Sequence, residues 1–337
     1  MSPKYSPAQP PRWQVATAFA AIYLIWGSTY LAIRIAIETF PPFLMAGMRF
    51  SVAGIILYLW SRQRGASRPM RSHWFAATVV GGLLLLVGNG GVVWAEQRVP
   101  SGLTALLVGM VPLWMALLEW LRPGGAKPLN GVIVGLTLGF LGMALLIGPV
   151  ELAGGDHVDL VGAAVLIFAS LSWATGSLYS RRAQLPASPL LATGMEMLAG
   201  GALLLIASLL AGEWMRFDAS ALSLRSWLAL GYLIVFGALI GFTAYIWLLR
   251  VSTPAHVSTY AYVNPVVAIF LGWAFANEPL TARTLLAAAV IVAAVVIITT
   301  YRARSVKETK PAQDERSILT KPRVKFSGAM PQLLEEP

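Results

Sequence analysis

Two charged side chains, Arg49 and Glu196, stand inside long apolar stretches of the sequence. A charge at the centre of a membrane-spanning helix costs at least about 2.5 kcal/mol, so it usually has a partner or a function. An arginine can hold an anion, and a glutamate can hold a cation or carry a proton. Two interpretations stay open: the residues form one ion pair, or each contacts a ligand or a proton separately.

Aromatic and polar side chains within apolar stretches form a second candidate set. Trp26 and Tyr30 are four residues apart, as are Tyr260 and Asn264, so each pair shares a helix face. Their rings can stack on a ligand, or they can pack helices and anchor the protein at the membrane surface. With Arg49 and Glu196, the candidate cavity comprises Trp26, Ser28, Thr29, Tyr30, Asn89, Trp114, Trp173, Thr243, Tyr245, Tyr260, Tyr262 and Asn264.

Two prolines, Pro112 and Pro265, also lie inside apolar stretches. Each removes a helical hydrogen bond, and a freed carbonyl at membrane depth is tolerated only against protein or a wet cavity. We therefore predict that both prolines line a central path or permit gate bending.

The elements that carry these residues are apolar and long. Hydrophobic residues make up 57% of the chain and charged residues 12%, against roughly 25% charge in a soluble domain. A spanning helix needs about 20 apolar residues. The sequence therefore predicts an all-α polytopic membrane protein with ten transmembrane helices, at 15–33, 43–60, 74–94, 101–121, 130–148, 160–180, 189–211, 226–249, 255–276 and 282–301.

The chain also repeats itself. A shift of 147 residues places Trp26 on Trp173, and a shift of 153 places Pro112 on Pro265. Each copy holds five spans, an odd number, so the two repeats must cross the bilayer with inverted orientation. The expected parts are an N-terminus at 1–14, repeat one at 15–148, an outer loop at 149–159, repeat two at 160–301 and a tail at 302–337 that we expect to be disordered.

Charge placement orients these spans. The net charge is +10, and most basic residues outside the spans fall in segments that share the side of the N-terminus, above all in the tail. The positive-inside rule therefore predicts that both termini are cytoplasmic. The basic excess orients the protein in the membrane, so no nucleic-acid partner is expected.

Four segments form a recognisable pattern: Tyr-Leu-Ile-Trp-Gly-Ser-Thr-Tyr at 23–30, Phe-Pro-Pro-Phe-Leu-Met-Ala-Gly-Met-Arg-Phe at 40–50, Gly-Asn-Gly-Gly-Val-Val-Trp-Ala at 88–95 and Tyr-Val-Asn-Pro-Val-Val-Ala at 262–268. Together they resemble the EamA domain of the drug/metabolite transporter superfamily. The resemblance covers about residues 15–301 and implies a ten-helix carrier with inverted repeats that exports metabolites, amino acids or amphipathic drugs from a bacterial cytoplasm. One departure is that repeat one has no acidic residue equivalent to Glu278.

We therefore expect a secondary transporter of the bacterial inner membrane that exports small amphipathic metabolites by alternating access. Amino acids with aromatic or bulky apolar side chains are the first choice, because the candidate cavity is rich in Trp and Tyr. Export of hydrophobic cations, with Glu196 as counter-charge, is the alternative, and a membrane enzyme acting on lipid head groups is a distant one. Proton antiport through Glu196 and facilitated exchange are equally compatible. Apart from the substrate and the bilayer no partner is required, so a monomer is compatible with the sequence.

Enzyme chemistry has little support. The chain has no cysteine, its three histidines lack metal-ligand spacing, and it contains no His-Glu-x-x-His, Gly-x-Ser-x-Gly or Walker A sequence. We expect no catalytic residue, no metal and no cofactor.

Overall fold

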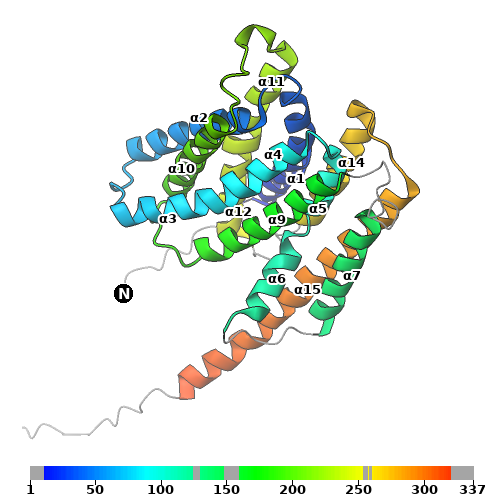
Figure 1. Ribbon diagram of the computed structural model, residues 1–337. Helices are drawn as coiled ribbons and strands as arrows, with labels where there is room; N and C mark the ends of the chain where they lie inside the picture. The colour runs from blue at the N-terminus through cyan, green and yellow to red at the C-terminus, as the bar shows by residue number, and fades with distance from the viewer. Residues whose placement is uncertain (1–10, 124–129, 148–158, 253–256, 258–259, 320–337) are drawn as a thin grey trace, which may run out of the picture.

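The computed structural model describes the chain except for residues 1–10, 124–129, 148–158, 253–256, 258–259 and 320–337. Every regular element in the described part is helical (Figure 1). The prediction of an all-helical chain is therefore confirmed.

The first half of the chain begins with two long helices and continues with two spans that are divided internally. Its elements are α1 (Arg12–Ala36), α2 (Pro42–Gln63), α3 (Arg71–Gly81), η1 (Gly82–Asn89), α4 (Gly90–Ala95), α5 (Ser101–Val108), α6 (Val111–Leu121) and α7 (Asn130–Ile147). The segment α3–η1–α4 is one helical span from Arg71 to Ala95, in which η1 is π-helical.

The second half follows the same order. Its elements are α9 (Leu160–Ser180), α10 (Pro189–Leu210), a short 3₁₀ helix η2 (Ala219–Ala221), α11 (Leu224–Tyr232), η3 (Leu233–Ile240), α12 (Gly241–Val251), α14 (Tyr260–Ala276) and α15 (Ala282–Leu319). The segment α11–η3–α12 again contains a π-helical stretch, η3, in the middle of one span.

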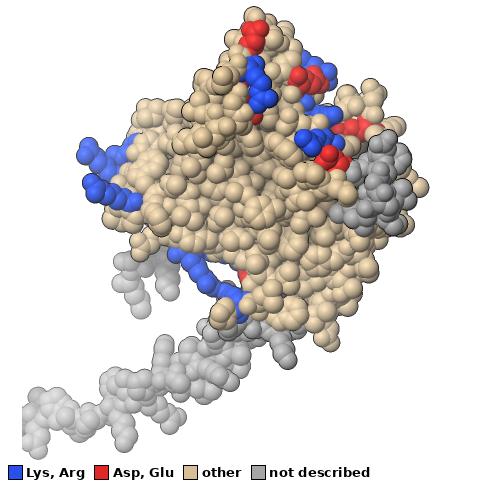
Figure 2. All heavy atoms as spheres, viewed as in Figure 1, with Lys and Arg blue, Asp and Glu red and all other residues tan. Residues whose placement is uncertain are grey.

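Seven helical segments in the described residues are long and apolar enough to cross a membrane. Three shorter apolar helices accompany them, at Asn130–Leu145, Val263–Ala276 and Ala282–Ile298. Charged side chains gather at the ends of the bundle and leave a broad uncharged surface between them (Figure 2).

Helix starts follow from local sequence. Pro42 and Pro189 occupy the first turns of α2 and α10, where a missing backbone N–H costs nothing. The Ser188 hydroxyl accepts a hydrogen bond from the backbone N–H of Leu191, and the Asp159 carboxylate accepts one from Gly162. These caps satisfy N–H groups that have no partner within the helix.

Helices from the two halves pack closely on one another. Helix α2 lies along α10, and α7 lies along α15 (Figure 1). Helix α1 packs on α14, α12, η3 and α11, while α9 packs on η1, α4, α5 and α6. The candidate residues on α1 and α9 are thus placed at the centre of the bundle.

Two features differ from the expectations. The span expected at 101–121 is interrupted after Val108, and Pro112 lies in the first turn of α6 instead of inside one helix. Helix α15 continues to Leu319, beyond the span expected at 282–301. Residues 302–319 contain no glycine and many residues with high helix propensity, which favour the extension, whereas Pro311 opposes it.

Candidate functional site

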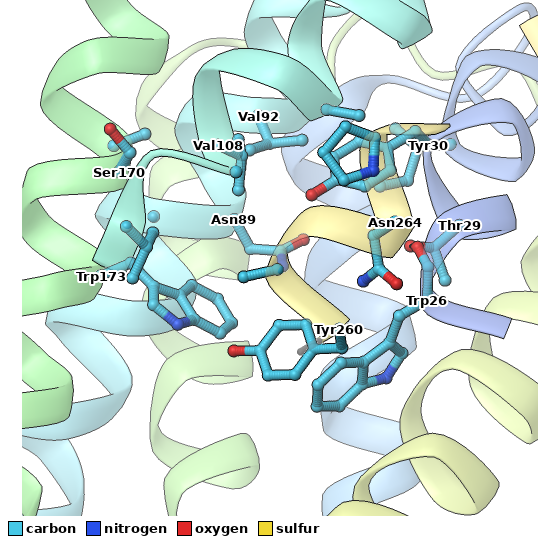
Figure 3. A pocket seen from close by; sticks show the side chains of 18 of the residues that line it. Trp26, Thr29, Tyr30, Asn89, Val92, Val108, Ser170, Trp173, Tyr260 and Asn264 are labelled. Atoms are coloured by element: carbon cyan, nitrogen blue, oxygen red, sulfur yellow. The ribbon is translucent and has the colours of Figure 1, made fainter. Parts of the chain in front are cut away.

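A cavity of about 110 Å³ lies at the centre of the bundle, where helices of both halves meet (Figure 3). Nine residues proposed from the sequence line it: Trp26, Thr29, Tyr30, Arg49, Asn89, Trp173, Tyr260, Asn264 and Pro265. Most of the remaining lining is small or apolar, as with Val92, Ala105 and Ala169. The structure thus brings together α1, α2, η1, α9 and α14 at one site.

An aromatic cluster holds Trp26 in place at one wall. Its indole N–H donates a hydrogen bond to the Gly237 carbonyl of η3 at 3.2 Å. Its ring lies 5.1 Å from the Tyr260 ring, at an angle of 84°, and 5.2 Å from the Tyr245 ring. The edge-to-face contact with Tyr260 and the tilted contact with Tyr245 stabilise and orient the indole ring, so this wall is an ordered apolar surface.

Arg49 is the charged group of the site. Among the described residues that line the cavity, it alone carries a charge. Its side chain is 4% exposed, and its Nε atom has no hydrogen-bond partner. A Cβ atom added at Gly237 would lie 3.0 Å from Nη2 of Arg49 and 3.1 Å from Thr29, so the absence of a side chain there makes room for the guanidinium.

Two amides of the lining have different surroundings. Asn264, in the orientation that satisfies its neighbours, donates to the backbone carbonyls of Tyr260 and Tyr23, each at 3.2 Å. The Asn89 Oδ1 atom is buried without a partner, and Figure 3 shows this side chain between Trp173 and Asn264. Asn264 therefore supports the helix packing, whereas Asn89 keeps an unused acceptor at the cavity.

The other proposed residues whose side chains are described do not line the cavity. The Ser28 hydroxyl lies 2.6 Å from the Tyr232 hydroxyl, and Trp114 donates to Ser170, a lining residue, at 2.9 Å. Tyr245 lies behind Trp26 and Tyr260. Pro112, Thr243 and Glu196 are absent from the lining, and the side chain of Tyr262 falls outside the described residues.

Arg49 and Glu196 are not joined as an ion pair, although α2 packs along α10. Ion pairs between described residues include Arg98–Asp159, Arg181–Glu119 and Arg225–Glu38, which lie away from Arg49 in the sequence. The carboxylate that acts electrostatically on Arg49 is Glu96.

Sequence reasoning missed Glu96, which follows the span Arg71–Ala95 by one residue. It is 0% exposed, and neither carboxyl oxygen has a hydrogen-bond partner. Burial raises the pKa of the Glu96 carboxyl well above its usual range, Glu278 raises it further, and Arg34 and Arg49 oppose the shift. The sequence signal was slight, since an acid beyond the end of an apolar stretch normally lies in water.

Two other acids cap helices across the halves. Glu213 accepts hydrogen bonds from the backbone N–H groups of Phe43, at 3.1 Å, and Leu44, at 2.8 Å, at the start of α2. Glu278 accepts them from Ser101, at 2.7 Å, and Gly102, at 3.0 Å, at the start of α5. A carboxylate at a helix N-terminus satisfies free N–H groups and complements the helix dipole.

A second cavity, of about 550 Å³, opens at the end of the bundle where Glu96 lies. It is lined by Arg34, Ile35, Ile37, Glu38, Gln97, Arg225, Phe275, Ala276 and Asn277. We call it the outer cavity and the first one the central cavity. An aromatic central cavity with one buried cation, beside a polar outer cavity, has the form of a binding site on a path through the bundle.

Comparison with known proteins identifies the family. The EamA-like transporter family matches residues 13–148 and 160–300, which is most of the chain. The chain belongs to this family. It is 44% identical to the inner membrane transporter YedA of Escherichia coli K12, over 80% of this chain and 85% of YedA. It is 25% identical to the transporter YvbV of Bacillus subtilis, over 82% of this chain and 88% of YvbV.

A solved crystal structure shares the fold, with a TM-score of 0.59 and 22% identity over 87% of this chain and 99% of that one. The predicted resemblance to the EamA domain is confirmed, and the family is one of membrane transporters rather than enzymes. The length and apolar composition of the helices suit a protein embedded in a membrane. The relative YedA is itself named as an inner membrane transporter.

Proposed function

We propose that this EamA-family member exports small amphipathic metabolites that carry a carboxylate, with aromatic or bulky apolar amino acids as the main substrates. The observation that carries the proposal is the single buried guanidinium, Arg49, in a cavity walled by aromatic rings. Guanidinium groups bind carboxylates through two parallel hydrogen bonds. The rings of Trp26 and Tyr260 offer the apolar surface that an aromatic or branched side chain needs.

The remaining polar group fits the other end of an amino acid. The Asn89 Oδ1 atom is an acceptor without a partner, and an ammonium group is a donor. The cavity volume of about 110 Å³ lies below the roughly 300–1,000 Å³ of drug-sized sites, which favours a small metabolite.

The alternative substrate class, hydrophobic cations, has less support. A cation in the central cavity would meet the positive charge of Arg49, while Glu196, the expected counter-charge, does not line the cavity. Like charges in a low-dielectric site repel strongly.

The architecture that supports this function is a ten-span bundle of two inverted five-helix repeats, working by alternating access in the bacterial inner membrane with both termini in the cytoplasm. The seven long spans and three shorter apolar helices correspond to the ten stretches of the sequence. The packing of α1 on η3 and α14 is matched by the packing of α9 on η1, α5 and α6, as a two-fold relation between repeats requires.

Transport by purified protein in liposomes tests the proposal. Labelled aromatic and branched amino acids are compared with a quaternary ammonium dye, for the parent and for Arg49→Met. We expect saturable amino-acid transport by the parent. Loss of the charged hydrogen bonds, worth about 1.5–3 kcal/mol, should weaken the apparent affinity of Arg49→Met about ten- to a hundredfold.

A glycine pair supplies a matched control. Gly237→Ala places a methyl group 3.0 Å from Arg49 and should impair transport, whereas a Cβ atom at Gly231 meets nothing within 4 Å, so Gly231→Ala should not. Saturable transport of the dye without transport of amino acids would overturn the proposal in favour of cations.

A further inference from the structure

A thin layer of residues separates the central cavity from the outer cavity. On α1, Ile33 lines the central cavity, and the next residue, Arg34, lines the outer one. Beyond η1, Val92 of α4 lines the central cavity and Gln97 lines the outer one, with Glu96 between them. We call Ile33, Arg34 and Glu96 the barrier layer.

Within the barrier layer the Glu96 carboxyl group has no direct hydrogen-bond partner. Both of its oxygens are buried and unpartnered. The Arg34 guanidinium, which could neutralise it, donates to the backbone carbonyl of Glu96 instead. An ionised carboxylate that is buried without hydrogen bonds costs several kcal/mol, so this geometry favours the neutral acid.

Charged and titratable groups reach Glu96 from the elements packed around it. Arg34 and Tyr30 come from α1, Arg49 comes from α2, and Glu278 follows α14. Helix α9 packs on α4, and the acid at the start of α9 is Asp159. Its carboxylate pairs with Arg98 at 3.6 Å. Glu278 accepts hydrogen bonds at the start of α5, which fixes a second carboxylate near Glu96. The negative charge of a nearby carboxylate disfavours ionisation of a buried carboxyl group.

We propose that Glu96 is a proton-binding site that controls the opening of the barrier layer: the closed layer holds the carboxyl protonated, and the proton leaves when the layer opens to the water of the outer cavity. The proposal rests on the alternating access proposed above. It assigns the proton to Glu96, at the boundary between the two cavities, instead of to Glu196.

The sign of the pH dependence follows from linkage. The closed layer binds the proton more tightly than the open layer, where water can solvate the carboxylate. Protonation of Glu96 therefore stabilises the closed layer fully at a pH below the pKa that Glu96 has in the open layer. This stabilisation is lost as the pH rises to the pKa that Glu96 has in the closed layer. Between these two values, the ratio of open to closed protein rises by up to about tenfold for each pH unit.

The sequence offers a direct test because the chain contains no cysteine. Ala105→Cys places a thiol in the central cavity, and Ala276→Cys places one in the outer cavity. Each variant is labelled in intact cells with a membrane-impermeant maleimide while the external pH is varied. Labelling of Ala276→Cys shows that the outer cavity faces the medium. Dividing the labelling rate of Ala105→Cys by that of Ala276→Cys removes the pH dependence of thiol reactivity itself.

We expect the ratio of central to outer labelling to rise with external pH. Glu96→Gln, which mimics the protonated acid, should keep the central thiol protected and remove the pH dependence. Glu38→Gln changes an exposed acid in the outer cavity, so the pH dependence should persist in this control.

A ratio that does not change with pH in the parent, or the same dependence in Glu96→Gln, would overturn the proposal. Should Glu96→Gln be lost from the membrane, Glu278→Gln tests it independently. Removing the charge of Glu278 should lower the pH at which the ratio of central to outer labelling rises. If that pH is unchanged or higher, the result contradicts the proposal for Glu96. Labelling needs no substrate, so failure here is distinct from failure of the amino-acid assay.

Discussion

The buried carboxylates of this protein differ in their hydrogen-bond partners. Glu213 is 6% exposed and accepts two backbone hydrogen bonds at the start of α2, whereas Glu96 accepts none in the described structure. A helix N-terminus therefore supplies two N–H donors to one buried acid, while the other buried acid has no such donors.

At the residue scale we predict that Glu213→Ala destabilises the protein substantially. The change leaves the N–H groups of Phe43 and Leu44 without their acceptor, and hydrogen bonds to charged groups are worth about 1.5–3 kcal/mol. We expect the free energy of unfolding to fall by about 2–4 kcal/mol, measured as a lower midpoint of thermal denaturation in detergent.

The matched control is Glu38→Ala. Glu38 is an exposed acid paired with Arg225 at 3.3 Å, and such pairs contribute about 0–1 kcal/mol. Equal shifts of the denaturation midpoint in the two variants would show that the cap contributes nothing special.

At the scale of elements, the regular α-helix is interrupted where the central cavity forms. The π-helical segments η1 and η3 occupy the middle of corresponding spans in the two halves. Asn89 of η1 lines the cavity, and Gly237 of η3 accepts the Trp26 hydrogen bond and lies against Arg49. Short π-helical segments are frequent at functional sites because they redirect side chains locally.

Adjacent glycines at the junction of α3 and η1 give a prediction about helix packing. A Cβ atom at Gly81 would lie 2.6 Å from the Glu196 carbonyl and 2.8 Å from the Gly200 nitrogen, both in the backbone of α10. At Gly82 the nearest atom is Leu203 Cδ1, at 3.6 Å. A backbone atom of a helix cannot move aside by a change of rotamer, as the end of a leucine side chain can.

We therefore expect Gly81→Ala to lower stability by about 1–3 kcal/mol through overpacking, and Gly82→Ala to be neutral or slightly stabilising. The fraction of protein that stays monodisperse in size-exclusion chromatography after heating measures both. Tolerance of Gly81→Ala equal to that of Gly82→Ala would mean that α3 and α10 do not approach as closely as described.

At the scale of the whole molecule, the distribution of charge predicts the orientation in the membrane. Charged side chains gather at the ends of the bundle (Figure 2), and basic residues are dense where α2 ends and α3 begins. The two acids that cap helices across the halves, Glu213 and Glu278, both belong to the second half and act on helices of the first. The two ends of the bundle are thus chemically different.

We predict that reporter fusions after residues 66, 155 and 310 read cytoplasm, periplasm and cytoplasm. The reason is the excess of basic residues in the segments that share the side of the N-terminus. Alkaline phosphatase and a fluorescent protein, active on opposite sides of the membrane, measure each position. A periplasmic reading at 66 or 310 would contradict this topology.

The sequence alone was sufficient for the helical class, the family resemblance and a good part of the cavity. Trp26, Tyr30, Tyr260 and Asn264 could be found because helix geometry places residues four apart on one face, and this periodicity is local. Arg49 could be found because a charge within an apolar stretch is expensive wherever the helix finally lies.

Only the tertiary structure decided which groups face one another. The predicted repeat aligns Arg49 with Glu196, yet sequence positions that align need not point toward each other, and the carboxylate that acts on Arg49 is Glu96. Glu96 became recognisable only through its burial next to α4, where α2 and α9 pack on α4 and Arg34 of α1 donates to the Glu96 backbone carbonyl. The hydrogen bond between Glu213 and Phe43 of α2 joins residues that are 170 positions apart in the sequence. No local pattern encodes such a contact, because side-chain partners at this separation are set by packing.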